Sequence, residues 1–229
     1  NGVTVYLLDA NGLRIPGSST TTASITLSGI TTNGYYSFSG LQPGSYGIEV
    51  TAPTGYLLTA RDQGTNDAKD SDVSTSTGKS ASVNLASDQT YNDLDIGLYK
   101  PASIGNFIWE DTNADGIQQG TEQGINGVVV NLLNSNGSAV TDGSGKSIST
   151  TTQSVVIDGF TYNGYYNFNG LQPGAYIIEV ISPSGAFQFS ATGQGGNSAF
   201  DSDISPVDGK PGTARSASVT LTSGQSRDD

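Results

Sequence analysis

Residues 111–122, DTNADGIQQGTE, place oxygen-bearing side chains at the spacing of a calcium-binding loop. A loop of this kind ligates its ion through positions 1, 3, 5, 7, 9 and 12, and it has glycine at position 6, where the backbone turns sharply. Gly116 occupies position 6 of this loop. The expected ligands, in chain order, are Asp111, Asn113, Asp115, the carbonyl of Ile117, Gln119 (directly or through water) and Glu122.

The alternative for this loop is an ordinary polar turn, because Asp and Asn side chains often accept hydrogen bonds from nearby backbone groups. The glutamate at position 12 favours the metal, since a polar turn has no need of it. An all-oxygen donor set suits Ca²⁺, whereas Mg²⁺ demands a tighter octahedron and keeps its own waters. We therefore expect Ca²⁺ as the cofactor.

A second candidate calcium site lies in the acidic stretch DQGTNDAKDSD, residues 62–72, and its DSD motif returns at residues 201–203. The candidate ligands are Asp62, Asp67, Asp70 and Asp72, and in the second motif Asp201 and Asp203. Asp93 and Asp95 are further candidates that would complete a site between carboxylates. The alternative is an acidic loop that is simply solvated.

Composition excludes many kinds of site. The chain has 229 residues and a formal net charge of -12, and it lacks Cys and His. Disulfides, thiolate or imidazole metal sites and nucleophiles paired with histidine are therefore excluded, and we expect no enzyme. The negative charge disfavours nucleic acid and anionic lipid as partners, and no apolar run is long enough to insert into a membrane.

The sequence contains an internal repeat. Its clearest match is NGYYSFSGLQPGSYGIEV at 33–50, which returns as NGYYNFNGLQPGAYIIEV at 163–180. NGVTVYLL at 1–8 returns as NGVVVNLL at 126–133, and SASVNL at 80–85 returns as SASVTL at 216–221. The chain is long enough for two domains of about 100 residues, so we expect two copies of one domain.

Within each copy the apolar residues alternate, as in half-buried strands. Val3, Val5 and Leu7 show this period, as do the segments 36–38, 46–50, 83–85 and 94–98. Short alternating runs separated by Gly-containing turns predict an all-β protein with tandem antiparallel β-sandwiches. LQPG at 41–44 predicts a tight hairpin, because proline and glycine supply its backbone angles.

Each copy lacks one element that the other has. The segment 103–125 before the second copy has no counterpart in the first, and LDIGLY at 94–99 has no counterpart in the second. We therefore place one repeat that lacks its first strand at 1–100, and one that lacks its last strand at 101–229. Either the chain is a window on a longer array, or missing strands are donated between copies.

These motifs together resemble the B-type repeats of staphylococcal serine-aspartate-repeat surface proteins, which are related to collagen-adhesin B repeats. The resemblance implies a prealbumin-like or immunoglobulin-like sandwich that binds several calcium ions in a surface stalk. Related collagen-adhesin repeats often carry a Lys-Asn isopeptide bond with an acid that Glu49 or Glu179 would mimic. The first strand, ASIGNFIWED at 102–111, has no lysine, so we expect no such crosslink.

The expected function is that of a rigid, calcium-stabilised spacer or fibre-building unit of an extracellular surface protein. Its partners would be neighbouring repeats or other copies of the chain, and the short joint LYKPAS at 98–103 favours an extended array. One alternative is an adhesive module that binds a host protein or glycan, with Tyr35, Tyr36, Tyr165 and Tyr166 as a platform. Another is a filament subunit linked by donated strands.

Overall fold

The computed structural model describes residues 1–183 and 187–228, except for the side chain of Asp67. It divides into two compact units, Asn1–Lys100 and Pro101–Asp229, which we call unit 1 and unit 2. The expectation of an all-β protein is confirmed, since strands dominate both units and the described helical content is one short 3-10 turn. None of the helical structure described is long or apolar enough to cross a membrane.

Unit 1 is built on one antiparallel sheet with the strand order β2-β1-β5-β7. Its strands are β1 (Thr4–Leu8), β2 (Arg14–Thr21), β5 (Gly44–Val50) and β7 (Val83–Leu85). Val5 lies opposite Val50, and both side chains are buried with Ile48 and Val73 in the core. The alternation predicted for the first and third of these strands is thus confirmed, and it places one sheet face against the core.

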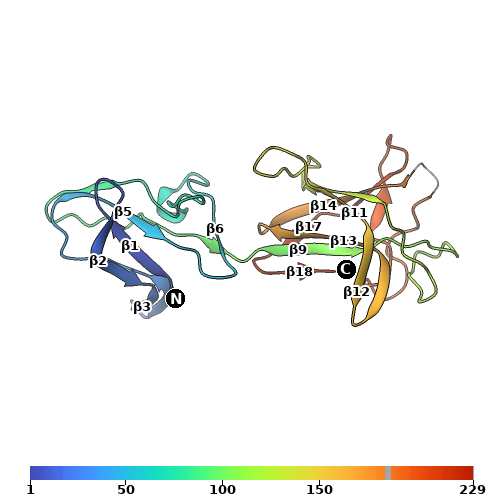
Figure 1. Cartoon of the computed structure of the whole chain (residues 1–229), viewed down its shortest axis with the longest axis horizontal. Helices are drawn as coiled ribbons and strands as arrows, with labels where there is room; N and C mark the ends of the chain where they lie inside the picture. The colour runs from blue at the N-terminus through green and yellow to red at the C-terminus, as the bar shows by residue number, and fades with distance from the viewer. Residues whose placement is uncertain (184–186, 229) are drawn as a thin grey trace. The chain divides into compact units, whose positions relative to one another are not determined.

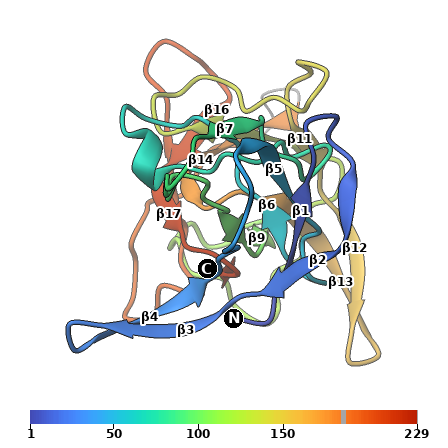
Figure 2. The same ribbon diagram turned by 90° about the vertical axis from the view of Figure 1, so that its left-hand side faces the viewer.

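The remaining elements of unit 1 are short. They are the hairpin β3 (Ala23–Leu27) and β4 (Ile30–Tyr35), the pair β6 (Leu57–Leu58) and β8 (Leu98–Tyr99), and the 3-10 turn η1 (Asp67–Lys69). Figure 2 shows the hairpin extending away from the four-stranded sheet. The strand expected over 94–98 was too long, because only its end joins β8, although Leu94 and Ile96 still pack against the core.

Unit 2 contains two sheets. The first has the order β11-β10-β14-β16-β15, with β17 also pairing to β14, and the second has the order β12-β13-β9-β18. The strands are β9 (Ala102–Phe107), β10 (Val129–Asn134), β11 (Ser149–Thr151), β12 (Gln153–Ile157), β13 (Phe160–Leu171), β14 (Gly174–Ile181), β15 (Ile204–Pro206), β16 (Thr213–Ser216), β17 (Val219–Leu221) and β18 (Ser226–Arg227).

The two sheets of unit 2 form a β-sandwich (Figure 1). Ile104 and Phe168 from the second sheet share one buried cluster with Leu132, Ile178 and Val180 from the first. Strand β9 pairs with β13 over the segment that matches residues 35–41 of unit 1, where the backbone forms no strand beyond β4. The second sheet therefore depends on β9, for which unit 1 has no counterpart.

The LQPG segment is not the tight hairpin that the sequence predicted. In unit 2 it joins β13 to β14, and these strands belong to different sheets. A tyrosine bonds back to this segment in each unit: the Tyr176 hydroxyl donates to the Gln172 carbonyl at 2.8 Å, and the Tyr46 hydroxyl donates to the Gln42 carbonyl at 3.0 Å. The arrangement resembles the tyrosine corner of immunoglobulin-like sandwiches, in which a tyrosine bonds to backbone a few residues upstream.

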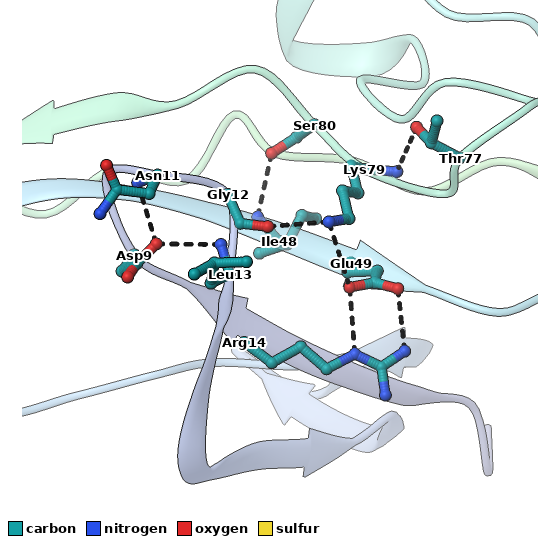
Figure 3. Close-up of polar contacts among 10 residues, drawn as sticks. All are labelled: Asp9, Asn11, Gly12, Leu13, Arg14, Ile48, Glu49, Thr77, Lys79 and Ser80. Carbon is teal, nitrogen blue, oxygen red and sulfur yellow. Dashed lines mark hydrogen bonds and ion pairs between the residues drawn. The ribbon is translucent and has the colours of Figure 1, made fainter.

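Each unit also has a paired glutamate on its main sheet. In unit 1 the Arg14 guanidinium donates to both oxygens of Glu49, at 3.0 and 2.8 Å, and Lys79 Nζ lies 3.9 Å from Glu49 Oε2 (Figure 3). In unit 2 Glu179 accepts from Arg215 at 2.8 Å and from Asn131 at 3.1 Å. The hydrogen bond from Arg14 lowers the pKa of Glu49. Glu179 thus links β14 to its neighbours β10 and β16, whereas Glu49 on β5 pairs with Arg14 of β2, on the far side of β1.

Candidate calcium-binding sites

Unit 1 brings together three of the predicted carboxylates. Oxygen atoms of Asp62, Asp70 and Asp72 lie within 4.8 Å of one another, and this is the one such acidic group among the residues described. Asp62 has φ of 55°, a left-handed conformation that Asp tolerates better than most residues. Asp70 and Asp72 follow η1. Three carboxylates this close repel one another, and Asp62 Oδ2 also forms an ion pair with Arg61 Nε at 3.5 Å.

Asp95 joins this cluster, which we call the unit 1 acidic cluster (Asp62, Asp70, Asp72 and Asp95). Its backbone N–H donates to Asp72 Oδ2 at 2.6 Å, and the Asp72 N–H donates to the Asp95 carbonyl at 2.9 Å. Burial raises the pKa of Asp95, and the charges of Asp93 and Asp70 raise it further. Asp70 and Asp95 also line a hollow of about 400 Å³ together with Gln63 and Lys69. Two acidic residues of the cluster, Asp70 and Asp95, thus border a space large enough for a cation.

An aspartate oxygen in each unit is buried without a hydrogen bond. Asp70 Oδ1 in unit 1 and Asp201 Oδ1 in unit 2 are buried and accept no hydrogen bond from the residues described. The two residues are equivalent in the repeat, at an offset of 131 positions. A buried carboxylate oxygen without a hydrogen bond is costly, and it is well suited to a hard cation. The oxygen chemistry of this donor set therefore fits Ca²⁺.

The loop at 111–122 is folded around its own acidic side chains. Asp111 accepts hydrogen bonds from the N–H groups of Asp115 at 3.2 Å and Gly116 at 2.8 Å. Gly116 has φ of 76°, and an added Cβ would lie 2.4 Å from the Ala191 carbonyl, so position 6 requires glycine. Burial raises the pKa of Asp111, but hydrogen bonds from Ser190 and the loop backbone outweigh it and hold that pKa below its usual value.

The other two acids of this loop have different surroundings. Asp115 is exposed, and its carboxylate accepts from the Gln119 side chain, from the Ile117 N–H at 2.9 Å and from the Asn113 side chain at 2.8 Å. The bonds from Gln119 and Ile117 lower the pKa of Asp115. Glu122 is buried and closes the loop, because it accepts from the N–H groups of Thr112 at 2.8 Å and of Gln119 at 3.0 Å.

The backbone of the loop is therefore already folded, but its acidic side chains do not converge on one point. Among the described residues, Asp111, Asp115 and Glu122 do not form a group like the one in unit 1. The side-chain amides of Asn113 and Gln119 donate to Asp115. To bind calcium as predicted, both amides would turn their oxygens toward the ion and Glu122 would release its bonds to backbone N–H groups.

The structure also joins two stretches that lie far apart in the sequence. Residues 116–118 of the loop run beside residues 200–202: the Ser202 N–H donates to the Gly116 carbonyl at 3.0 Å, and the Gln118 N–H donates to the Phe200 carbonyl at 2.6 Å. Asp111, Asp201 and Asp203 consequently line one cavity in unit 2. Gly193 stands where unit 1 has Asp62, so the three-acid group of unit 1 is not repeated there.

The side chain of Asp67 lies outside the described part of the structure, so its predicted role stays a prediction. Ser190, whose hydroxyl bonds to Asp111, was not singled out from the sequence, because no spacing rule connects residues so far apart. The ligand assignments at Asp111, Asn113, Asp115, Ile117, Gln119 and Glu122 likewise stay predictions.

The sequence matches known proteins along nearly its whole length. The SdrD B-like domain family matches residues 1–98 and 102–229. Serine-aspartate repeat-containing protein F of Staphylococcus epidermidis is 39% identical over 186 residues, which cover 81% of this chain and 9% of that protein. Serine-aspartate repeat-containing protein D of Staphylococcus aureus (strain Newman) is 37% identical over 205 residues, which cover 89% of this chain and 13% of that protein. The chain thus spans about a tenth of the length of these relatives.

Similarity to solved structures is weaker. The minor pilin GBS52 of Streptococcus agalactiae aligns with 100% of this chain and 80% of its own, at 13% identity and a TM-score of 0.27. The major pilin subunit BcpA of Bacillus cereus aligns with 99% of this chain and 94% of its own, at 11% identity and a TM-score of 0.26.

Proposed function

The chain belongs to the SdrD B-like domain family, and from this premise we propose that it is a calcium-stabilised structural module of an extracellular surface protein. The family resemblance inferred from the repeat motifs is confirmed by this match. Membership supports a structural or adhesin-associated role. The proposal adds that calcium holds the acidic loops in their folded form.

The observation that carries the proposal is the unit 1 acidic cluster, in which three carboxylates lie within 4.8 Å and Asp70 keeps a buried oxygen without a hydrogen bond. The equivalent oxygen of Asp201 is in the same state. Internal charge repulsion and an unsatisfied buried atom both disfavour the folded loop in the absence of a cation. A calcium ion removes both costs, so its binding is linked to folding.

The expected gain is moderate for each ion. Calcium sites of extracellular modules bind at roughly 10⁻⁴ to 10⁻³ M. At about ten times the dissociation constant, one ion adds about 1.4 kcal/mol to the free energy of unfolding by mass action. Several ions would supply a sizeable share of the roughly 5 to 15 kcal/mol that stabilises a typical domain. Calcium then acts to stiffen a spacer whose partners are neighbouring repeats.

The adhesive alternative loses one of its supports. Tyr36 and Tyr166 pack against the cores of units 1 and 2, respectively, so these residues cannot form part of an exposed tyrosine platform. Burial raises the pKa of both hydroxyl groups. A spacer needs no exposed recognition platform, and we therefore favour the structural role over binding of a host protein or glycan.

The test is thermal unfolding of the 229-residue chain in EDTA and in millimolar calcium, with an Asp115→Ala variant beside it. We expect calcium to raise the unfolding midpoint by several degrees and Asp115→Ala to lose part of that gain. Magnesium at the same concentration serves as the matched control and should have a smaller effect. An unchanged midpoint in calcium would contradict the proposal.

A further inference from the structure

Residues 94–99 of unit 1 lie in a slot formed by several separate segments. The Tyr36 hydroxyl donates to the Leu94 carbonyl, and the N–H groups of Asp95 and Gly97 donate to side chains of Asp72 and Ser71. The Thr59 N–H donates to the Gly97 carbonyl at 2.9 Å. Leu98 and Tyr99 then pair with β6. These contacts hold the segment along its whole length.

The slot restricts which residue types the bound segment can have at particular positions. Leu94 and Ile96 pack against the core of unit 1, so these two positions require apolar side chains. At Gly97 an added Cβ would lie 2.8 Å from Thr59 Oγ1 and 2.9 Å from Thr59 Cβ, which leaves room only for glycine. The slot therefore selects an extended segment with apolar residues at its first and third positions and glycine at its fourth, followed by two residues that pair with β6.

Unit 2 has the same slot without its strand. A cavity of about 560 Å³ lies there, within the usual range for ligand pockets. Its lining includes the repeat equivalents of the residues that hold the segment in unit 1: Tyr166 for Tyr36, Gln188 and Phe189 for β6, Ser190 for Thr59, and Ser202 and Asp203 for Ser71 and Asp72. Ile178 and Val180, the equivalents of Ile48 and Val50, form part of its wall.

Another atom of this cavity is unsatisfied. The indole Nε1 of Trp109, which lines the cavity, is buried and has no hydrogen-bond acceptor among the described residues. A strand in the cavity would bring backbone carbonyls, which are the acceptors that such a buried donor needs. A purely apolar occupant would fill the volume and leave this atom unpaired.

We propose that the cavity of unit 2 is an acceptor slot for one extended polypeptide strand with the pattern of residues 94–99, LDIGLY. The matching slot of unit 1 shows how such a strand lies: Leu94 and Ile96 pack against the core, and Gly97 lies against Thr59 and Ser71. Insertion closes the open side of the sandwich. Strand binding is measured in EDTA as well as in calcium, so its success or failure is distinguishable from that of the metal proposal.

Trp109 provides the readout, because it is the one tryptophan of the chain and it lies in unit 2. The probe is a fluorescein-labelled peptide of residues 92–100, NDLDIGLYK, added to the full chain in EDTA and again in calcium. We expect a saturable rise in polarisation together with a change in Trp109 emission. The same peptide with Gly97→Leu should bind at least about tenfold more weakly, because the slot has no room for the side chain.

Two variants locate the binding. Tyr166→Phe should weaken it about fivefold, the effect of losing one neutral hydrogen bond, while Tyr36→Phe, the same change in the occupied slot, should leave it unaltered. In a second chain, LDIGLY is appended after Asp229, the position equivalent to Asp93. This chain should show the altered Trp109 emission without peptide and should no longer bind it.

Three results would overturn the proposal. One is the absence of any change in Trp109 emission in both EDTA and calcium. Another is equal binding of the Gly97→Leu peptide, and the third is binding that Tyr166→Phe and the appended strand leave unaffected. The first result includes the case in which the peptide raises polarisation but leaves Trp109 emission unchanged, because such a peptide binds elsewhere on the surface.

Discussion

Asp70 and Asp201 occupy equivalent positions in the two units, and each keeps a buried Oδ1 atom that accepts no hydrogen bond from the residues described. The surroundings of the two differ, because Asp70 lies beside Asp62 and Asp72 while Asp201 lies beside the loop that contains Asp111. Both atoms suit the cation that we propose, because a hard cation would satisfy a buried carboxylate oxygen in either setting.

Asp70→Asn should change the stability of the protein in opposite directions in EDTA and in calcium. In EDTA the variant should be as stable as the parent or more stable, because it removes one charge from the unit 1 acidic cluster. In calcium it should be less stable, because it removes a ligand. Urea unfolding under both conditions measures the difference, with exposed Asp88→Asn as the matched control. A loss of stability that is the same in EDTA and in calcium would argue against a metal at Asp70.

Glu122 and Asp115 should behave differently in the loop at 111–122. Glu122→Ala should destabilise unit 2 even in EDTA, by about 1–3 kcal/mol, because it removes the buried carboxylate that accepts from the N–H groups of Thr112 and Gln119. Asp115→Ala should have little effect in EDTA, since the side chain is exposed, and should reduce only the gain from calcium. Denaturant unfolding of both variants separates the two roles, and equal effects in EDTA would refute this division.

Gly124→Ala tests the close packing at the end of the same loop. An added Cβ would lie 1.9 Å from the Asn163 carbonyl, so the backbone must move apart, at a cost of about 1–3 kcal/mol in the free energy of unfolding. Gly120→Ala is the matched control, because no atom lies within 4 Å of its added Cβ. Thermal unfolding should show a lower midpoint for the first variant alone. Equal midpoints would show that the loop end adapts freely.

The ion pair of Glu49 predicts an acid-sensitive contribution to stability. Its pKa is lowered in the folded protein, chiefly by Arg14, so the contribution is complete above the unfolded pKa of about 4.3 and is lost as the pH falls through the lower, folded value. Glu49→Gln should lower stability by about 1 kcal/mol at neutral pH and by much less at pH values below both pKa values. Thermal midpoints measured across this range would contradict the account if the two proteins differed equally throughout.

The sequence predicts the fold well where side-chain pattern alone decides it. Alternation at residues 3–7 and 46–50 identifies the two central strands of unit 1, because one face of each packs on the core. The hairpin predicted at LQPG was wrong, because a turn-forming sequence does not reveal whether its flanking strands share a sheet. Residues 94–96 also pack on the core, yet they bond to loops and form no strand.

The candidate sites are only partly visible in the sequence. Spacing identifies the loop at 111–122, because its ligands are local. The association of Asp95 with Asp72, and of Gly116 with Ser202, depends on tertiary packing between distant segments, which no local pattern encodes. The slot in unit 2 becomes visible only when the two units are compared residue by residue.

Calcium titration by calorimetry tests the central claim most directly. The parent chain should show saturable binding of more than one ion in the range of roughly 10⁻⁴ to 10⁻³ M. Asp70→Asn and Asp201→Asn should each lose part of this binding, and the double variant should lose more. No saturable heat in the parent chain, or unchanged stoichiometry and affinity in the double variant, would contradict the account.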